Sequence, residues 1–526
     1  MNAKESQSVK PTNIVICSDG TGNSANKDRG TNVFKLYEAI DLIDPPGDSK
    51  HRKQIAIYDD GVGTETWKPV RVVTGALGLG LSRNVRQLYT ALARSYKPGD
   101  RIFLFGFSRG AFTVRALGGF ITACGILKGK EFTDAGLVKA VNVTYDVYRT
   151  KYMIGARQDY RKLREKPMTK STVPSAFHEK LERLHKRSDI HFHDEKQIAF
   201  IGVWDTVDAV GLPFDHLADF INYAIYPFKF SDQKLHRDVQ RARHAVSIDD
   251  ERHTFHPVMW VEPQDKDKDP ERIKQVWFAG VHSNVGGGYP KQGMSLESLD
   301  WMMTEAENAG GSEEGLRFVK ADRDYVRNHE NVNDKLYNSR AGLAVYYRYK
   351  PRDIHEFCKR ANAGAMIHAS VIDRIMQRTE GYAPGNLPAG LTIVATGDNA
   401  MRYPHAANAI NSEYGNQTSL LDRVKLLVWI RLRSHYIFLL LTVWALWVAI
   451  GPALPQEGVI AKLRALSSID LPSELLKAFV TDRLFDGIIA AIVICFLLGL
   501  WAERRMRQRF SAFWHEVVPQ LSEVSK

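Results

Sequence analysis

The residues best suited to do chemistry are a serine, an aspartate and a histidine, each directly after an apolar stretch. They are Ser108, Asp205 and His282. The chain order Ser, Asp, His is that of the α/β-hydrolase triad, in which the serine attacks, the histidine takes its proton and the acid orients the histidine. The three residues therefore predict nucleophilic hydrolysis of an ester or a related bond.

Ser108 is the centre of Gly-Phe-Ser-Arg-Gly, a Gly-x-Ser-x-Gly motif. The apolar run 101–107 precedes the motif and a helix-compatible segment, 111–124, follows it. This context predicts a nucleophile elbow, in which a strand ends, turns sharply at the serine and leads into a helix. Glycines on either side allow the close backbone approach that the turn needs. The N–H of Arg109, at the start of the helix, is then expected to help bind the oxyanion. A purely structural turn is the alternative.

Asp205 and His282 occupy equivalent positions after two further strands. Asp205 follows the apolar segment 197–204, and Asp208, one turn further on, is the alternative acid. His282 follows 275–281 and precedes a glycine-rich loop. A lone histidine is more often structural, but a histidine between a strand and a flexible loop fits the base of a triad.

The loop after the first predicted strand, Ser-Asp-Gly-Thr-Gly-Asn at 18–23, would lie beside the elbow if that strand is central. We expect the backbone N–H groups of Gly20 and Thr21 to supply the second half of the oxyanion hole, with an ordinary turn as the alternative. Asp19, Asp59 and Asp60 also suggest a divalent cation, because hard cations favour clustered carboxylates. The sequence does not show whether their two loops meet, so we predict neither a metal nor a cofactor.

Strands and helices alternate along most of the chain. The expected strands are 13–17, 54–58, 101–107, 197–204, 275–281 and 391–395. This alternation predicts an α/β fold with a mostly parallel sheet and a site at the carboxyl ends of its strands. We assign residues 12–400 to this α/β-hydrolase-like catalytic domain, preceded by a flexible N-terminus, 1–11. Within it, residues 126–195 are expected to form a helical insertion, either a lid over the site or a solvated excursion.

The composition changes after residue 426. Two apolar runs, about 436–454 and 485–502, predict a transmembrane helical hairpin over 435–503, between a basic juxtamembrane linker, 401–434, and a basic tail, 504–526. A pair of buried amphipathic helices is the alternative, but neither run has a polar face. Arginines flank both outer ends, which predicts that the catalytic domain lies on the cytoplasmic side of the inner (cytoplasmic) membrane. The N-terminus has no apolar signal-peptide core, which agrees with that placement.

The overall composition is that of a globular protein, with 44% hydrophobic and 25% charged residues, so wholesale disorder is excluded. The four cysteines lie far apart in the sequence and form neither a disulfide framework nor a metal-ligand cluster. The net charge of +11 comes without any nucleic-acid-binding motif. We therefore expect no nucleic acid partner, and attribute the charge to attraction toward anionic lipid headgroups.

Several ordered motifs together resemble a known α/β-hydrolase family that includes type VI secretion phospholipase effectors of the Tle class. The matching pieces are 18–23, 58–64, 106–112, 202–207, 244–252 and 281–289. The resemblance spans about residues 12–295 and does not include the hairpin. It implies a Ser-Asp-His triad at Ser108, Asp205 and His282 and ester hydrolysis on phospholipids.

The sequence as a whole thus predicts a membrane-anchored serine hydrolase that cleaves lipid esters. The expected partners are a phospholipid or other lipid ester and the membrane itself, with protein partners, acyl chain, headgroup and oligomeric state left open. Two alternatives remain. One is an esterase or thioesterase on soluble substrates, and the other is a catalytically silent membrane scaffold with a hydrolase fold.

Overall fold

The fold is built on one eight-stranded sheet. The structure, a computed structural model, describes residues 11–20, 30–43, 51–60, 80–162, 173–207, 233–263, 269–311, 313–395, 406–414, 417–454 and 469–523. The strand order is β2-β1-β3-β4-β5-β6-β7-β8, and every neighbouring pair is parallel. The strands are β1 (Thr12–Ser18), β2 (Lys53–Asp59), β3 (Arg101–Phe107), β4 (Ile198–Trp204), β5 (Val239–Ser247), β6 (Ile273–Phe278), β7 (Met366–His368) and β8 (Thr392–Val394).

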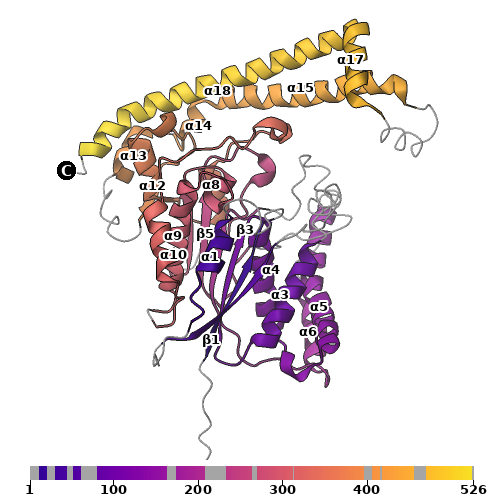
Figure 1. The fold of residues 1–526 in the computed structure, drawn as a ribbon, viewed down its shortest axis with the longest axis vertical. Coiled ribbons are helices and arrows are strands. Elements are labelled where there is room, and N and C mark those ends of the chain that lie inside the picture. Colours follow the sequence, from indigo (N-terminus) through magenta and orange to yellow (C-terminus); the bar gives the residue numbers. More distant parts are fainter. Residues whose placement is uncertain are drawn as a thin grey trace, which may run out of the picture.

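Helices cover both faces of the sheet, which explains why its central strands are apolar throughout rather than alternating. On β3, Ile102 and Leu104 pack toward α3 (Leu81–Ser95) and α4 (Arg109–Cys124). The residues between and after them, Phe103 and Phe105, pack toward α1 (Asn32–Ala39) and α9 (Gly293–Glu307) on the other face. Figure 1 shows these two helical layers on either side of the strands. The predicted α/β class is confirmed.

The order of the strands places a switch point between β1 and β3. The chain leaves β1 for β2 on one side and then returns across β1 to form β3 on the other side. The loops that follow β1 and β3 therefore diverge at the carboxyl edge of the sheet, which is where open α/β sheets bind their ligands. Ser18 pairs in register with Gly106, so the two loops start at the same level.

Two of the strands were not expected from the sequence. β5 carries polar and charged residues in a row, yet its Arg243 is buried because it pairs with Glu305 of α9 (Nε–Oε2 2.5 Å). β7 is only three residues long and gives no periodic signal. Residues 126–195 contain the helices α5 (Asp134–Lys162) and α6 (Val173–His185), and α5 packs against α3 and α4.

The remaining helices follow β6 and lead to the C-terminus. The shorter ones are α8 (His282–Gly286), α10 (Lys320–His329), α11 (Ile354–Ala361), α12 (Ala369–Met376), α13 (Ala406–Tyr414), α14 (Leu420–Arg423) and α17 (Leu471–Thr481). Two long helices, α15 (Lys425–Ile450) and α18 (Arg483–Glu523), pack side by side across the top of the catalytic domain in Figure 1. We call α15, α17 and α18 the hairpin.

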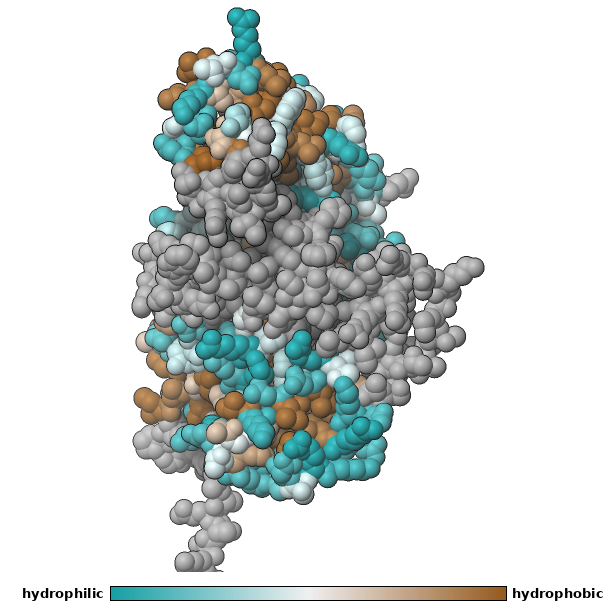
Figure 2. All heavy atoms as spheres, turned by 90° about the vertical axis from the view of Figure 1, so that its right-hand side faces the viewer, coloured by the Kyte–Doolittle hydropathy of each residue, from teal (hydrophilic) through white to brown (hydrophobic). Residues whose placement is uncertain are grey.

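Both long helices of the hairpin are long and apolar enough to cross a membrane, and only 11% of the most apolar window of each is buried. They are therefore not core helices of the domain. Viewed from its tip in Figure 2, the hairpin presents apolar side chains at the surface. By contrast, the C-terminal part of α18 packs on the domain through Phe513, Trp514 and Val517.

Candidate active site

The three residues singled out in the sequence come together at the carboxyl edge of the sheet. His282 Nε2 lies 2.8 Å from Ser108 Oγ, and His282 Nδ1 lies 2.6 Å from Asp205 Oδ2. All three side chains are buried. These distances are those of a hydrogen-bonded nucleophile, base and orienting acid.

Ser108 sits at a strained turn between β3 and α4. Its backbone has φ 58° and ψ −119°, a conformation that L-residues rarely adopt. The turn is possible because both neighbouring glycines lack a side chain: a Cβ at Gly106 would lie 2.5 Å from the carbonyl oxygen of Gly110, and a Cβ at Gly110 would lie 2.1 Å from that of Ser18. The sequence motif thus corresponds to a steric requirement at this junction.

Asp205 directly follows β4 and is held from two sides. Its backbone N–H donates to Ala245 of the neighbouring β5, and its φ of 38° turns the side chain out of the strand direction. Ser247, at the end of β5, donates its backbone N–H to Asp205 Oδ1 at 2.9 Å and its hydroxyl to Oδ2 at 3.3 Å. The residue that follows, Thr206, donates its N–H to the Nε2 of buried His244.

Arg352 forms a bidentate ion pair with the same carboxylate. Its Nη1 lies 2.6 Å from Asp205 Oδ1 and its Nη2 lies 2.9 Å from Oδ2, and neither side chain has any exposed surface. Nη1 and Nη2 also donate to the carbonyls of Ser247 and Phe255. Such fork geometry fixes the rotation of a carboxylate as well as its charge.

His282 begins α8 and is positioned by its backbone and by two aromatic rings. Its N–H donates to Asp250 Oδ2 at 3.2 Å, and Asp250 is itself paired with Arg252. The Phe107 ring lies against the imidazole with the centroids 4.6 Å apart, and the Phe255 ring meets it edge-on at 5.1 Å. The imidazole is therefore confined between polar and aromatic neighbours in one orientation.

Burial and charge set the protonation of the triad. Burial alone would raise the pKa of Asp205, but Arg352 and the hydrogen bonds from His282 and Arg352 outweigh it and hold that pKa well below its ordinary value. Burial lowers the pKa of His282, against the opposing effect of Asp205. At neutral pH the site thus holds an ionised acid and a neutral imidazole, as a general base requires.

The backbone N–H groups expected to bind the oxyanion belong to Arg109, Gly20 and Thr21, and the structure describes the first two of these residues. Arg109 is the first residue of α4, so its N–H belongs to the first turn, beside Ser108. The N–H of Gly20 donates to Asp19 Oδ1 at 2.6 Å. Thr21 lies outside the residues that the structure describes, as does Asp208, the alternative acid.

Two of the three aspartates considered as cation ligands lie at the ends of neighbouring strands and contact each other through their backbones. The N–H of Asp19 donates to the carbonyl of Asp59. Asp19 accepts hydrogen bonds from the hydroxyls of Thr31 and Tyr58, and Asp59 accepts from serine and asparagine side chains. Asp60 follows at an exposed position. Within the described part of the chain, no group of three or more His, Cys, Asp or Glu side chains is placed to hold a metal ion.

Three residues that support the triad were not found by sequence reasoning. Asp250 and Ser247 lie in the polar segment 244–252, where the resemblance to the family was noticed but no role was assigned. Arg352 lies in the stretch Tyr-Arg-Tyr-Lys-Pro-Arg, 347–352, in which nothing distinguishes it from the solvated charges around it. Only the fold brings it to Asp205, 147 residues away.

Comparison with known proteins gives a family and several distant likenesses. Residues 12–305 match the family described as T6SS, phospholipase effector Tle1-like, catalytic domain. An uncharacterised protein of the yeast Saccharomyces cerevisiae is 27% identical over an alignment of 263 residues that covers 48% of this chain. The match covers 33% of the yeast protein, so this chain corresponds to about a third of its length.

Two solved structures are more remote. An uncharacterised protein from Pseudomonas aeruginosa is 17% identical with a TM-score of 0.33, and the match covers 89% of this chain and 64% of that one. The Tle1 effector bound to the VgrG spike of the Type 6 secretion system is 16% identical with a TM-score of 0.28, over 53% of this chain and 51% of that one.

The fold and the site define the class of protein, an α/β protein with its candidate site at the carboxyl edge of a parallel sheet. The family match covers more than half of the chain and includes Ser108, Asp205 and His282. The chain belongs to the Tle1-like family of type VI secretion phospholipase effector catalytic domains, whose description is that of lipid hydrolases.

Proposed function

We propose that this chain is a membrane-anchored serine hydrolase that cleaves the ester bonds of phospholipids or related lipids. The observation that carries the proposal is the continuous hydrogen-bonded arrangement of Ser108, His282 and Asp205 at a nucleophile elbow. Membership of a phospholipase family supports the lipid ester as substrate.

In the proposed mechanism Ser108 Oγ attacks the ester carbonyl carbon while His282 Nε2 takes its proton. The tetrahedral oxyanion is stabilised by the N–H of Arg109, and the positive end of α4 favours the same charge. Collapse of this intermediate breaks the ester bond, and His282 gives the proton to the leaving alcohol. Water, deprotonated by His282, then cleaves the acyl-serine and releases the fatty acid. Asp205 holds the imidazole in the tautomer that both steps need.

The hairpin provides the proposed anchor. Its exposed side chains include Leu440, Val443 and Trp447, at 71%, 63% and 63% exposure. Such surface is unfavourable in water but suits the acyl chains of a bilayer. Basic residues follow or precede the outer ends of the two apolar runs, and this distribution supports a cytoplasmic position for the catalytic domain. An anchor of this kind raises the local concentration of lipid substrate.

The decisive experiment is the release of fatty acid from mixed phospholipid vesicles by the purified chain, with Ser108→Ala beside it. Release that disappears in the variant supports the proposal. If neither protein releases fatty acid but the wild type is labelled at Ser108 by a fluorophosphonate, the triad is active on another ester and the lipid substrate is wrong. If no label forms, the chain is not a serine hydrolase.

A further inference from the structure

The acid of the triad is bound to a buried arginine that the reaction does not require in general. A Ser-His-Asp triad needs the carboxylate to orient and stabilise the histidine, and backbone N–H groups can fix that carboxylate. Here Ser247 already supplies one such N–H. Arg352 adds two charged donors to the same two oxygens, one of which also binds His282.

The placement of Arg352 is rigid. Its Nη1 and Nη2 each bind one carboxylate oxygen and one backbone carbonyl, so the fork is held at four points. Its own carbonyl accepts from Asn386 Nδ2 at 3.0 Å, and the same amide donates to Ile248. A charged side chain with no exposed surface persists only where its partner is equally buried and equally well bonded, as Asp205 is.

We propose that Arg352 is a positioning residue for the catalytic acid and sets the working pH of the base. This inference rests on the proposed serine hydrolase function. The fork holds Asp205 Oδ2 toward His282 Nδ1, which fixes the tautomer in which Nε2 faces Ser108. Its positive charge also offsets part of the negative charge of Asp205, so the carboxylate raises the basicity of His282 less than it otherwise would. Two further charges act on the imidazole: Asp250 raises the pKa of His282 and Arg252 lowers it, and neither changes in an Arg352 variant.

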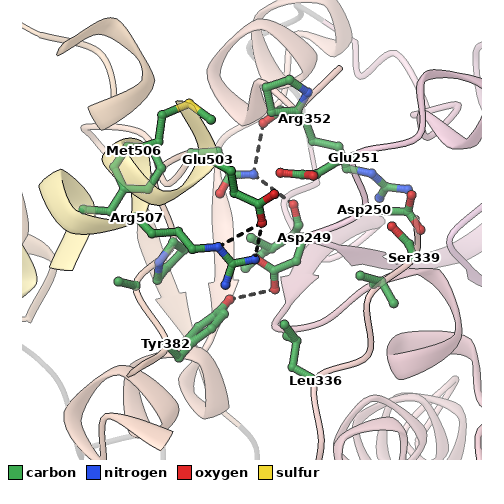
Figure 3. A pocket seen from close by; sticks show the side chains of 18 of the residues that line it. Asp249, Asp250, Glu251, Leu336, Ser339, Arg352, Tyr382, Glu503, Met506 and Arg507 are labelled. Atoms are coloured by element: carbon green, nitrogen blue, oxygen red, sulfur yellow. Dashed lines mark hydrogen bonds and ion pairs between the residues drawn. The ribbon is translucent and has the colours of Figure 1, made fainter. Parts of the chain in front are cut away.

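The segment that carries Arg352 extends from the triad to the base of the hairpin. Tyr349 of this segment lies beneath the guanidinium of Arg431 on α15, 4.1 Å from the ring centroid. Lys350 donates its N–H to the carbonyl of Glu251. Arg352, Glu251 and Asp250 line a cavity of about 400 Å³, together with Glu503 and Met506 of α18. Figure 3 shows these side chains. Arg352 thus lies between the triad and the hairpin.

The test is the pH dependence of kcat/KM on a soluble short-chain ester for Arg352→Gln and Arg352→Lys. The acid limb of the profile is the fall of kcat/KM at low pH. Without the arginine charge, we expect the acid limb of Arg352→Gln to move to higher pH, because His282 then faces the full charge of Asp205. We expect kcat to fall about 10- to 100-fold, the loss that corresponds to one hydrogen bond to a charged group, with little change in KM. Arg352→Lys keeps the charge but not the fork, so its limb should stay in place while kcat falls.

A matched control separates positioning from stability. Arg243 is also buried and ion-paired, but its partner is Glu305 and it does not contact the triad. Arg243→Gln is expected to lower the melting temperature without moving the acid limb. Because the position of the limb does not depend on how much protein is folded, partial unfolding of a variant does not imitate the expected result.

An unchanged limb and an unchanged kcat in Arg352→Gln would overturn the inference. If that variant does not fold, Arg352→Lys decides, since wild-type kcat there would show that the fork is not needed. Failure of the proposed function gives a different result: the wild type would then show neither ester hydrolysis nor fluorophosphonate labelling.

Discussion

The sheet buries its apolar side chains, whereas the hairpin leaves many of its apolar side chains exposed. Along β3, Ile102 to Phe105 have no exposed surface. On the hairpin, residues of the same kind are largely exposed, with Leu440 at 71% and Val443 at 63%. The interior of the domain also encloses an ionised aspartate and an arginine.

This contrast in exposure indicates that the two regions have different surroundings. In the domain, apolar burial stabilises the fold at roughly 25 cal/mol per Å² and surrounds a buried site in which a few charges have large effects. In the hairpin, many side chains of the same kind are exposed, and such surface suits a lipid bilayer. The proposed lipid hydrolase, anchored beside its substrate, would account for both regions.

The largest expected effect is at the centre of the buried region. Ser108→Ala removes the nucleophile and should reduce ester hydrolysis by roughly 10⁴-fold or more, as loss of a triad nucleophile does elsewhere. The measurement is kcat/KM on a short-chain ester and on vesicles. Equal loss on both substrates is expected, because the chemistry is the same wherever the ester lies. Retained hydrolysis on either would mean that another residue attacks.

The second prediction tests the other side of the comparison. Replacing Leu440 and Val443 together with arginine should release the chain from membranes, since each charge at the centre of a span costs about 2.5–3.5 kcal/mol. Both positions are exposed, so the domain should still fold and hydrolyse a soluble ester at the wild-type rate. The measurement is sedimentation with vesicles, combined with both activities.

Val138→Arg provides the control, because Val138 is an exposed valine (50%) on α5. Helix α5 begins at Asp134, which pairs with Arg94 of α3, and it packs on α3, α4 and α6. This variant should sediment with vesicles as the wild type does. If the hairpin variant also remained bound, the exposed apolar surface would need another explanation, such as a protein partner.

The contrast between the regions also explains what the sequence could predict. The meeting of Ser108, Asp205 and His282 was predictable because a Gly-x-Ser-x-Gly turn and strand-to-loop junctions are local patterns, and the two long helices of the hairpin because their apolar runs are continuous. β5 was missed because Arg243 and His244 are charged or polar in sequence and buried only through partners on other elements. Arg352 was missed for the same reason: its partner is 147 residues away.

A third prediction concerns the pH at which the buried base works. His282 must be neutral to accept the proton of Ser108, and burial lowers its pKa. A lower pKa keeps the imidazole neutral in more acidic solution, so the acid limb of kcat/KM should have its midpoint below pH 6.5, the ordinary value for histidine. The profile is measured on a soluble ester between pH 4 and 8. A midpoint at or above 6.5 would show that the imidazole is more solvated, or faces more negative charge, than this geometry gives.

The smallest expected effect lies where the two regions meet. Arg431 of α15 binds Glu251 of the domain at 2.9 Å and Glu503 of α18 at 2.8 Å. Glu251 follows Asp250, which holds the backbone of His282. Arg431→Met leaves both carboxylates without this partner and should loosen that segment, lowering kcat about two- to tenfold on soluble ester and vesicles alike.

Arg433→Met is the matched control for this junction. Arg433 lies two residues further along α15, is exposed, and stacks over Trp429 of the same helix instead of pairing with the domain. If the junction transmits the position of the hairpin to the triad, only Arg431→Met lowers the rate on soluble ester. If both variants keep the wild-type rate on soluble ester while Arg431→Met loses activity on vesicles, the ion pairs align the domain with the membrane and leave the triad untouched. In that case the ion pairs would hold the domain in place on the hairpin, while catalysis by the domain would not depend on them.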